Sequence, residues 1–138
     1  MKRVLLGALA CSLSTTLQMP AVAQSPGDAD VWIGIIDTDN GVLLDTDTGA
    51  AWLTGACLKP IAEARQVGST WVSETSELVS VGRMETLLQQ TFRLDLTASS
   101  PSISVENEAR GGTQTFHDVR VTPCTGGSCQ RLGTSPAC

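Results

Sequence analysis

The 138-residue sequence has no tyrosine and a single histidine, His117. A serine or cysteine nucleophile normally depends on an oriented base, so any such catalytic triad in this chain would have to use His117. The neighbouring Asp118 cannot orient the imidazole, because adjacent residues of a strand point to opposite faces. We therefore predict no catalytic residue, and we expect His117 to be a partly buried structural residue of the strand "TFHDVRVT".

Long apolar runs are also missing, since no stretch after the N-terminus offers about 18 consecutive apolar residues, as a membrane-spanning helix would need. The N-terminus itself, "MKRVLLGALACSLSTTLQMPAVAQ", has the charged start, the short apolar run and the small-residue cleavage site of a secretory signal peptide. We predict cleavage after Ala23 and a periplasmic or secreted location. A lipoprotein junction at Cys11 is the alternative, although Ala8 stands where a larger aliphatic residue is usual.

Basic residues are scarce in the predicted mature chain. Removal of residues 1–23 leaves 115 residues, enough for one domain with a modest core, which carry seven basic and fourteen acidic side chains. The net charge of about −7 makes binding to nucleic acid or anionic lipid unfavourable and favours a cationic protein partner. Six of the acids lie between Asp28 and Asp47, with no basic residue among them.

The cysteines predict a disulfide-stapled domain. Four remain after the predicted cleavage: Cys57, Cys124, Cys129 and Cys138. An even number in a small exported domain indicates two disulfides, in any of three pairings. A zinc site is a poor alternative, because "CTGGSC" has neither a second close cysteine pair nor a nearby histidine. We expect no metal and no cofactor.

The phrase Asp-Thr-Asp-x-Gly occurs twice, in the stretch "DTDNGVLLDTDTG" at 37–49. Each copy predicts a hairpin turn, in which the leading aspartate accepts hydrogen bonds from loop amides and the closing glycine adopts a left-handed conformation. Asp37 would close with Gly41, and Asp45 with Gly49. Alternatively, a two-residue type I′ turn at Asn40-Gly41 would change the register of the first hairpin without removing it.

The acids of these two turns are the candidate binding residues, namely Asp37, Asp39, Asp45 and Asp47. Consecutive turns of a meander lie at opposite ends of its middle strand, on the order of 10 Å or more apart, so the two pairs cannot share one calcium ion. A calcium site at Asp37 with Asp39, or at Asp45 with Asp47, is the weaker alternative. Neither phrase matches an EF-hand loop, because the glycine comes one position early.

Short β-prone segments separated by turn residues fill most of the chain. We predict strands in "DVWIGIID", which should be central, and in "VLLD", "AAWLT", "FRLDLT", "SISVE" and "TFHDVRVT", and extended chain in "STWVSETSELVSVG". One helical turn opened by Pro60 is expected in "LKPIAEARQVG". The apolar spacing of Met84, Leu87, Leu88 and Phe92 predicts a short helix over 83–91.

The predicted fold is mainly β: a small antiparallel sandwich or barrel with at most one or two short helices and two disulfides. The core candidates are Trp32, Trp52, Trp71, Phe92 and the aliphatic residues of the strands. We divide the chain into a signal peptide (1–23), a flexible segment (24–29), a single β-rich domain (30–123) and a disulfide-tethered tail (124–138).

The functional hypothesis is an exported, non-catalytic module that binds, or inhibits, a cationic protein through its acidic hairpins. A small hydrolase that uses a carboxylate pair is one alternative, because fourteen acids are available and their spacing in space is open. A calcium-stabilised structural or surface domain is the other. The oligomeric state, the disulfide pairing and the identity of the partner remain open at this point.

Overall fold

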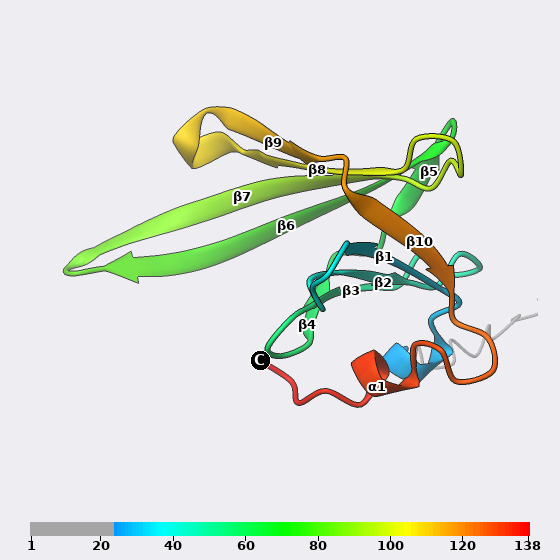
Figure 1. Ribbon diagram of the computed structural model, residues 1–138. Helices are drawn as coiled ribbons and strands as arrows, with labels where there is room; N and C mark the ends of the chain where they lie inside the picture. The colour runs from blue at the N-terminus through cyan, green and yellow to red at the C-terminus, as the bar shows by residue number, and fades with distance from the viewer. Residues whose placement is uncertain (1–23) are drawn as a thin grey trace, which may run out of the picture.

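The computed structural model describes residues 24–138, so the predicted signal peptide, its cleavage site and the alternative lipid site at Cys11 lie outside the described residues. Two antiparallel five-stranded sheets pack face to face, with strand orders β10-β1-β2-β3-β4 and β5-β6-β7-β8-β9 (Figure 1). The prediction of a mainly β sandwich with two disulfides is confirmed. The first strand, predicted to be central, lies between β10 and β2.

The strands are short in the first sheet and include two long ones in the second. The first sheet contains β1 (Val31–Ile35), β2 (Gly41–Leu44), β3 (Ala51–Thr54), β4 (Lys59–Ile61) and β10 (Val119–Pro123). The second contains β5 (Arg65–Val67), β6 (Thr70–Val81), β7 (Met84–Asp95), β8 (Ser102–Asn107) and β9 (Gly112–Phe116). Three one-turn helices complete the fold: η1 (Pro26–Asp28), η2 (Glu108–Arg110) and α1 (Gln130–Gly133).

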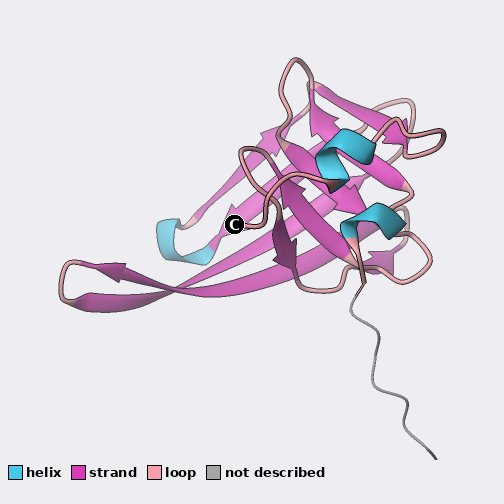
Figure 2. Cartoon of the chain, turned by 90° about the horizontal axis from the view of Figure 1, so that it is seen from below, coloured by secondary structure: helices cyan, strands magenta, loops and turns pink. Residues whose placement is uncertain are grey.

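The main core lies between the two sheets, where strand alternation directs apolar residues inward. Fully buried Ile33 and Leu44 of the first sheet share it with Phe92 and Leu94 of the second, and half-buried Trp71 packs at its margin. A smaller cluster covers the outer face of the first sheet, where Leu132 of α1 joins the buried residues Leu43, Trp52, Leu58 and Cys129. The outer face of the first sheet is therefore partly covered, with η1 and α1 lying over it (Figure 2).

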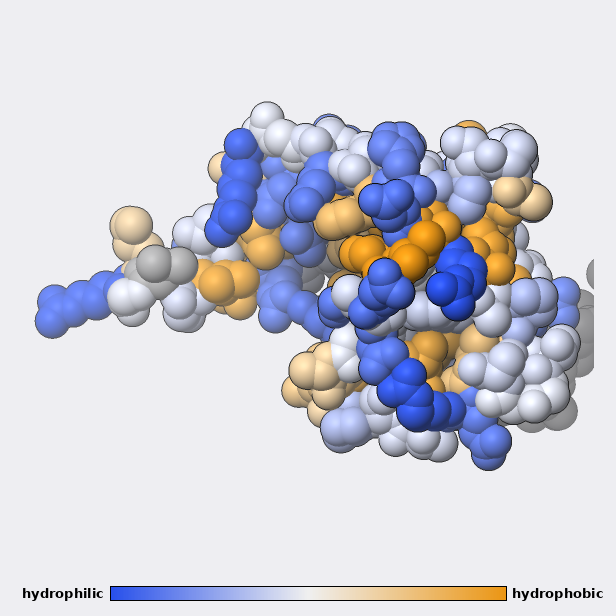
Figure 3. Space-filling model, in the orientation of Figure 1, coloured by the Kyte–Doolittle hydropathy of each residue, from blue (hydrophilic) through white to orange (hydrophobic). Residues whose placement is uncertain are grey.

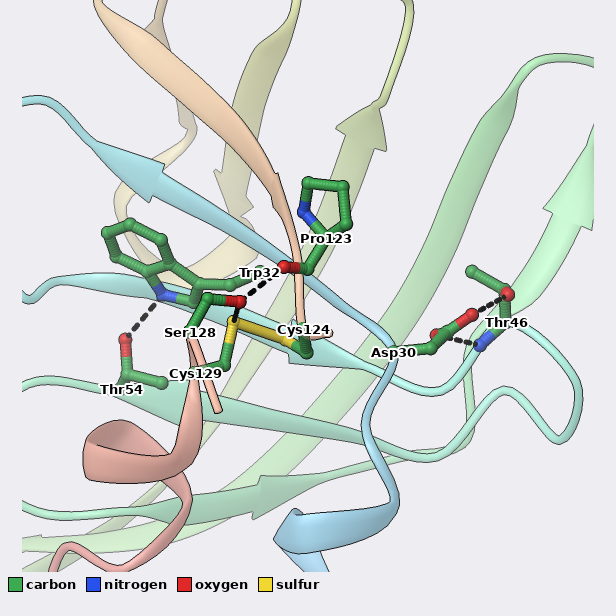
Figure 4. Close-up of a disulfide and its surroundings, with 8 residues drawn as sticks. All are labelled: Asp30, Trp32, Thr46, Thr54, Pro123, Cys124, Ser128 and Cys129. Carbon is green, nitrogen blue, oxygen red and sulfur yellow. Dashed lines mark hydrogen bonds between the residues drawn. A yellow bond between two sulfur atoms is a disulfide. The ribbon is translucent and has the colours of Figure 1, made fainter. Parts of the chain in front are cut away.

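One of the two disulfides attaches the C-terminal tail to the body of the fold. Cys57 pairs with Cys138 across 81 residues, with their Cα atoms 5.1 Å apart, and Cys124 pairs with Cys129 within the tail (Figure 4). A parallel bridge between Leu58 and Ala137 extends the contact made by the first bond. The structure thus selects one of the three possible pairings.

The predicted helix over 83–91 is wrong, because this segment is the first half of β7. It pairs residue by residue with β6, from Val81 opposite Met84 to Thr70 opposite Asp95. A spacing of four residues fits one face of a strand as well as one face of a helix, so Met84, Leu88 and Phe92 did not distinguish the two. Pairing with the β-prone strand β6 across a tight turn makes this segment a strand and not a helix.

Two smaller predictions also fail. The segment after Cys57 forms the strands β4 and β5 instead of a helical turn at Pro60. The strand expected around His117 is broken: β9 ends in one sheet, β10 begins in the other, and His117 lies exposed in the crossover between them. A histidine at a sheet-to-sheet crossover has no strand neighbours to bury it, which corrects the expectation of a partly buried residue.

The N-terminal segment predicted to be flexible contains η1, whose N-cap Ser25 accepts a hydrogen bond from the Gly27 N–H. Within residues 24–138, no helix is long and apolar enough to cross a membrane.

Candidate functional site

The two acidic turns lie at opposite ends of β2, as predicted, and the second has the expected chemistry. Asp45 Oδ1 accepts the N–H groups of Asp47 at 2.9 Å and Thr48 at 3.1 Å. Gly49 closes the turn by donating its N–H to the Asp45 carbonyl at 2.7 Å, with a left-handed φ of 82°. Burial of Asp45 would raise its pKa, but these hydrogen bonds, together with that from the Thr48 hydroxyl, outweigh burial and lower it.

The first turn is built differently from the prediction. Asp37 itself adopts the left-handed conformation, with a φ of 66°, and Gly41 belongs to β2. Neither the predicted closure at Gly41 nor the alternative type I′ turn at Asn40-Gly41 forms. Gly41 is needed for a different reason, because a Cβ atom there would lie 2.3 Å from the Ile33 carbonyl oxygen and 2.9 Å from Trp32 Nε1.

Most of the acids between Asp28 and Asp47 hold the structure together. Asp28 accepts the Ser25 N–H at the start of η1, and Asp30 accepts the N–H and the hydroxyl of Thr46 (Figure 4). Asp45 organises its turn, and Asp39 forms an ion pair. Of the predicted binding acids, only Asp37 and Asp47 are exposed with no hydrogen bond to their carboxylates from the described residues, and they lie at opposite ends of β2.

The four candidate aspartates therefore do not form one continuous acidic surface. In residues 24–138, no group of three or more histidine, cysteine or acidic side chains is placed to hold a metal ion.

Asp39 pairs with Arg131 of α1 in a two-pronged ion pair. Nη1 lies 2.8 Å from Oδ2 and Nη2 lies 2.7 Å from Oδ1. The hydrogen bonds from Arg131 lower the pKa of Asp39, and those to Asp39 raise the pKa of Arg131. This contact joins the first turn to the C-terminal tail, which are 92 residues apart in the sequence.

A pocket of about 390 Å³ adjoins this ion pair on the outer face of the first sheet. We call it the Trp32 pocket; its lining residues are Trp32, Ile35, Ile36, Asp37, Thr38, Asp39, Arg120 and Arg131. It brings together two of the four predicted acids with two arginines that the sequence analysis did not single out. No motif marked these arginines, since Arg120 lies on β10 and Arg131 on α1, far from the acids in the chain.

The pocket bears on the hypothesis of carboxylate-pair hydrolysis. A general acid in such a site needs a raised pKa, so that it holds a proton near neutral pH. Arg131 instead lowers the pKa of Asp39 and keeps that carboxylate ionised. Asp39 therefore lacks the raised pKa of a general acid and has the ionised state of the second carboxylate in such a pair.

The other prominent feature is the hairpin of β6 and β7, which extends well beyond the sandwich (Figure 1). β5 pairs with β6 only at Thr70–Val72, and β8 pairs with β7 only at Gln90–Asp95. The distal part of the hairpin, Ser76–Gln89, is thus a two-stranded ribbon in which no other described strand pairs with either edge. We call this part the arm.

Large apolar side chains are exposed on the arm. Leu78 is 60% exposed and lies directly opposite Leu87, which is 51% exposed; Met84 is 70% exposed next to the turn. Figure 3 shows the arm projecting from the body with apolar patches between its polar residues. Because both faces of the ribbon are open, folding buries little of the apolar surface of these side chains. That surface is available to a partner.

In comparisons with protein-family models, curated proteins and solved structures, nothing matched this chain.

Proposed function

We propose that this chain is an exported, non-catalytic binding module that engages a protein partner through the arm. The observation that carries the proposal is the free backbone edge of β6 beyond its pairing with β5, from Glu74 to Val81. That edge is longer than an average strand and has no proline to block pairing. A partner that contributes an extended segment to this edge would satisfy its unpaired N–H and C=O groups.

The side chains beside this edge define the chemistry of the partner segment. Leu78 and half-buried Val79 lie on opposite faces of β6, so a segment with apolar residues on both faces would cover them. Glu74 and Glu77 border the same edge, in exposed ion pairs with Arg65 and Lys59 respectively. Such exposed pairs are weak and can be exchanged for a basic residue of the partner.

The overall charge supports a basic partner as well. The net charge of about −7 for residues 24–138 would raise the association rate with a cationic protein at low salt. The acidic hairpins contribute to this field through Asp37 and Asp47, although the contact surface we propose is the arm. Inhibition of the partner would follow if the bound segment belongs to its active site.

The proposed location is the periplasm or the extracellular space. Two disulfides are typical of an oxidising compartment, and the pattern of residues 1–23 is that of a signal peptide cleaved after Ala23.

The experiment is affinity capture with tagged chain from an extract of the cells that produce it, comparing variants of the arm. We expect a double Leu78→Asp, Leu87→Asp variant to recover at least about tenfold less of the specific partner, because it places charge at the centre of the contact. Val67→Asp is the matched control, since Val67 is 57% exposed but lies on β5, outside the arm. Melting curves of both variants should match that of the unmodified chain.

A partner that both variants retain equally would show that the arm is not the contact surface. Capture that is unchanged between low and 1 M salt would contradict the basic character of the partner. If no protein is enriched by the unmodified chain over a tag-only control, the proposal of a binding module fails.

A further inference from the structure

The indole of Trp32 forms the floor of the pocket and lies flat on two glycines of the sheet. A Cβ atom at Gly34 would lie 1.9 Å from Trp32 Cζ2, and one at Gly41 would lie 2.9 Å from Trp32 Nε1. Any larger residue at Gly34 would lift the ring off the strand. One face of the indole is thus covered by backbone, while the ring also lines the pocket.

Hydrogen bonds keep the indole in this position. Trp32 Nε1 donates to Thr54 Oγ1 at 3.3 Å (Figure 4), and Thr54 Oγ1 donates to the Asp39 carbonyl at 2.6 Å. The same turn that carries Asp37 and Asp39 is therefore linked to the ring. A preformed aromatic surface loses little conformational freedom when a ligand binds to it.

The walls of the pocket are charged and of both signs. Arg120 lies directly opposite Gly34 in the pairing of β10 with β1, so its side chain emerges on the same face as the indole. Among the described residues, none forms an ion pair with Arg120, whereas Arg131 is held by Asp39. Asp37 and Thr38 add a carboxylate and a hydroxyl to the lining.

These groups fit a sugar that carries one carboxylate. The C–H face of a pyranose ring packs on an indole, and aspartate and threonine oxygens accept or exchange hydrogen bonds with ring hydroxyls. The unpaired guanidinium of Arg120 binds a carboxylate in a planar, two-pronged manner. A second negative charge on the ligand would meet Asp37 and Asp39, which disfavours phosphate and strongly acidic peptides.

We propose that the Trp32 pocket binds a single uronic acid residue flanked by neutral sugars. The proposal is independent of the arm, which lies on the other sheet. Trp32 provides the stacking surface, Arg120 selects the carboxylate, and the Asp39–Arg131 pair fixes the wall that contacts the hydroxyls.

The test uses as its acidic trimer a linear trisaccharide of galactose whose central residue is galacturonic acid, with the neutral galactose trimer and the peptide Gly-Gly-Glu as comparators. In ¹H–¹⁵N spectra, each of the three tryptophans gives one indole N–H signal, and Trp32→Phe assigns that of Trp32. We expect the acidic trimer, at about 10 mM or below, to shift the Trp32 signal and leave the signals of buried Trp52 and half-buried Trp71 unchanged.

Arg120→Gln separates recognition from folding. We expect it to weaken binding of the acidic trimer by at least about tenfold, the usual loss of a charged hydrogen bond, with little effect on the neutral trimer. Arg93→Gln is the matched control, because Arg93 is an exposed arginine of β7 outside the pocket. Gly34→Ala should abolish the shift of the Trp32 signal by displacing the indole.

Several results would overturn the proposal. These are an unshifted Trp32 signal in the presence of the acidic trimer, equal affinity for the neutral trimer, tighter binding of Gly-Gly-Glu, or equal losses in Arg120→Gln and Arg93→Gln. None of them depends on capture of a protein by the arm, so failure here leaves that experiment intact.

Discussion

Arg131 of the C-terminal helix holds both carboxylate oxygens of Asp39, a residue of the turn between the first two strands. The ion pair lies beside the Trp32 pocket and connects the wall of that pocket to the disulfide-bonded tail. The turn and the tail are thus coupled by one exposed contact, whose strength depends on the ionisation of Asp39.

The ion pair makes stability depend on pH in the acid range. The folded-state pKa of Asp39 lies below its ordinary value of 3.8, so the pair stabilises the folded chain at pH values above 3.8. That contribution is lost as the pH falls through the lowered folded-state pKa. We expect a ¹³C NMR titration to show a midpoint for Asp39 below 3.8, and Arg131→Gln to raise it. An unchanged midpoint in this variant would show that Arg131 does not hold the carboxylate in solution.

Asp45 and Asp47 are the first and third residues of the same short phrase and have different roles. Asp45→Ala removes the acceptor of two backbone N–H groups in a buried position, and we expect it to lower the free energy of unfolding by about 1–3 kcal/mol. Asp47 is exposed and accepts no hydrogen bond from the described side chains. We therefore expect Asp47→Ala to change the free energy of unfolding by less than about 0.5 kcal/mol. Urea denaturation measures both. Equal losses would contradict the assignment of Asp45 as the organiser of the turn.

The two disulfides should contribute unequally. The Cys57–Cys138 bond closes a loop of 81 residues, and the Cys124–Cys129 bond closes one of 5. In the chain-entropy model, removing the first costs about 4 kcal/mol and removing the second about 2 kcal/mol. Paired Cys→Ser substitutions at each bond, compared by chemical denaturation, test this order. A larger loss from Cys124→Ser with Cys129→Ser would mean that the tail stabilises the fold mainly through its own structure.

Composition and local pattern were sufficient to predict the architecture. Most of the strands follow from β-prone runs separated by turn residues, and the disulfides follow from the even cysteine count of residues 24–138. The helix predicted over 83–91 failed because Met84, Leu88 and Phe92 fit both periods. Only Leu87 favoured the helical one, and it is exposed on the opposite face of β7.

The candidate sites were harder to predict, because they depend on contacts between distant residues. The sequence shows that acids cluster between Asp28 and Asp47. It does not show that most of them organise turns, cap a helix or form an ion pair. Arg120 and Arg131 carry no local signal, and pairing of β10 with β1 is needed to place Arg120 beside Gly34. The arm depends on how far β5 and β8 extend along the β6–β7 hairpin, which no local pattern sets.

Hydrogen–deuterium exchange of the chain, alone and with its captured partner, tests the central claim most directly. In the free chain, we expect the unpaired N–H groups of the β6 edge at 74–81 to exchange quickly. On addition of the partner, peptides that cover this edge should become protected, while those of β9, the far edge strand of the same sheet, should not change. Protection of β9 or of the first sheet, with exchange in the arm unaltered, would contradict the account.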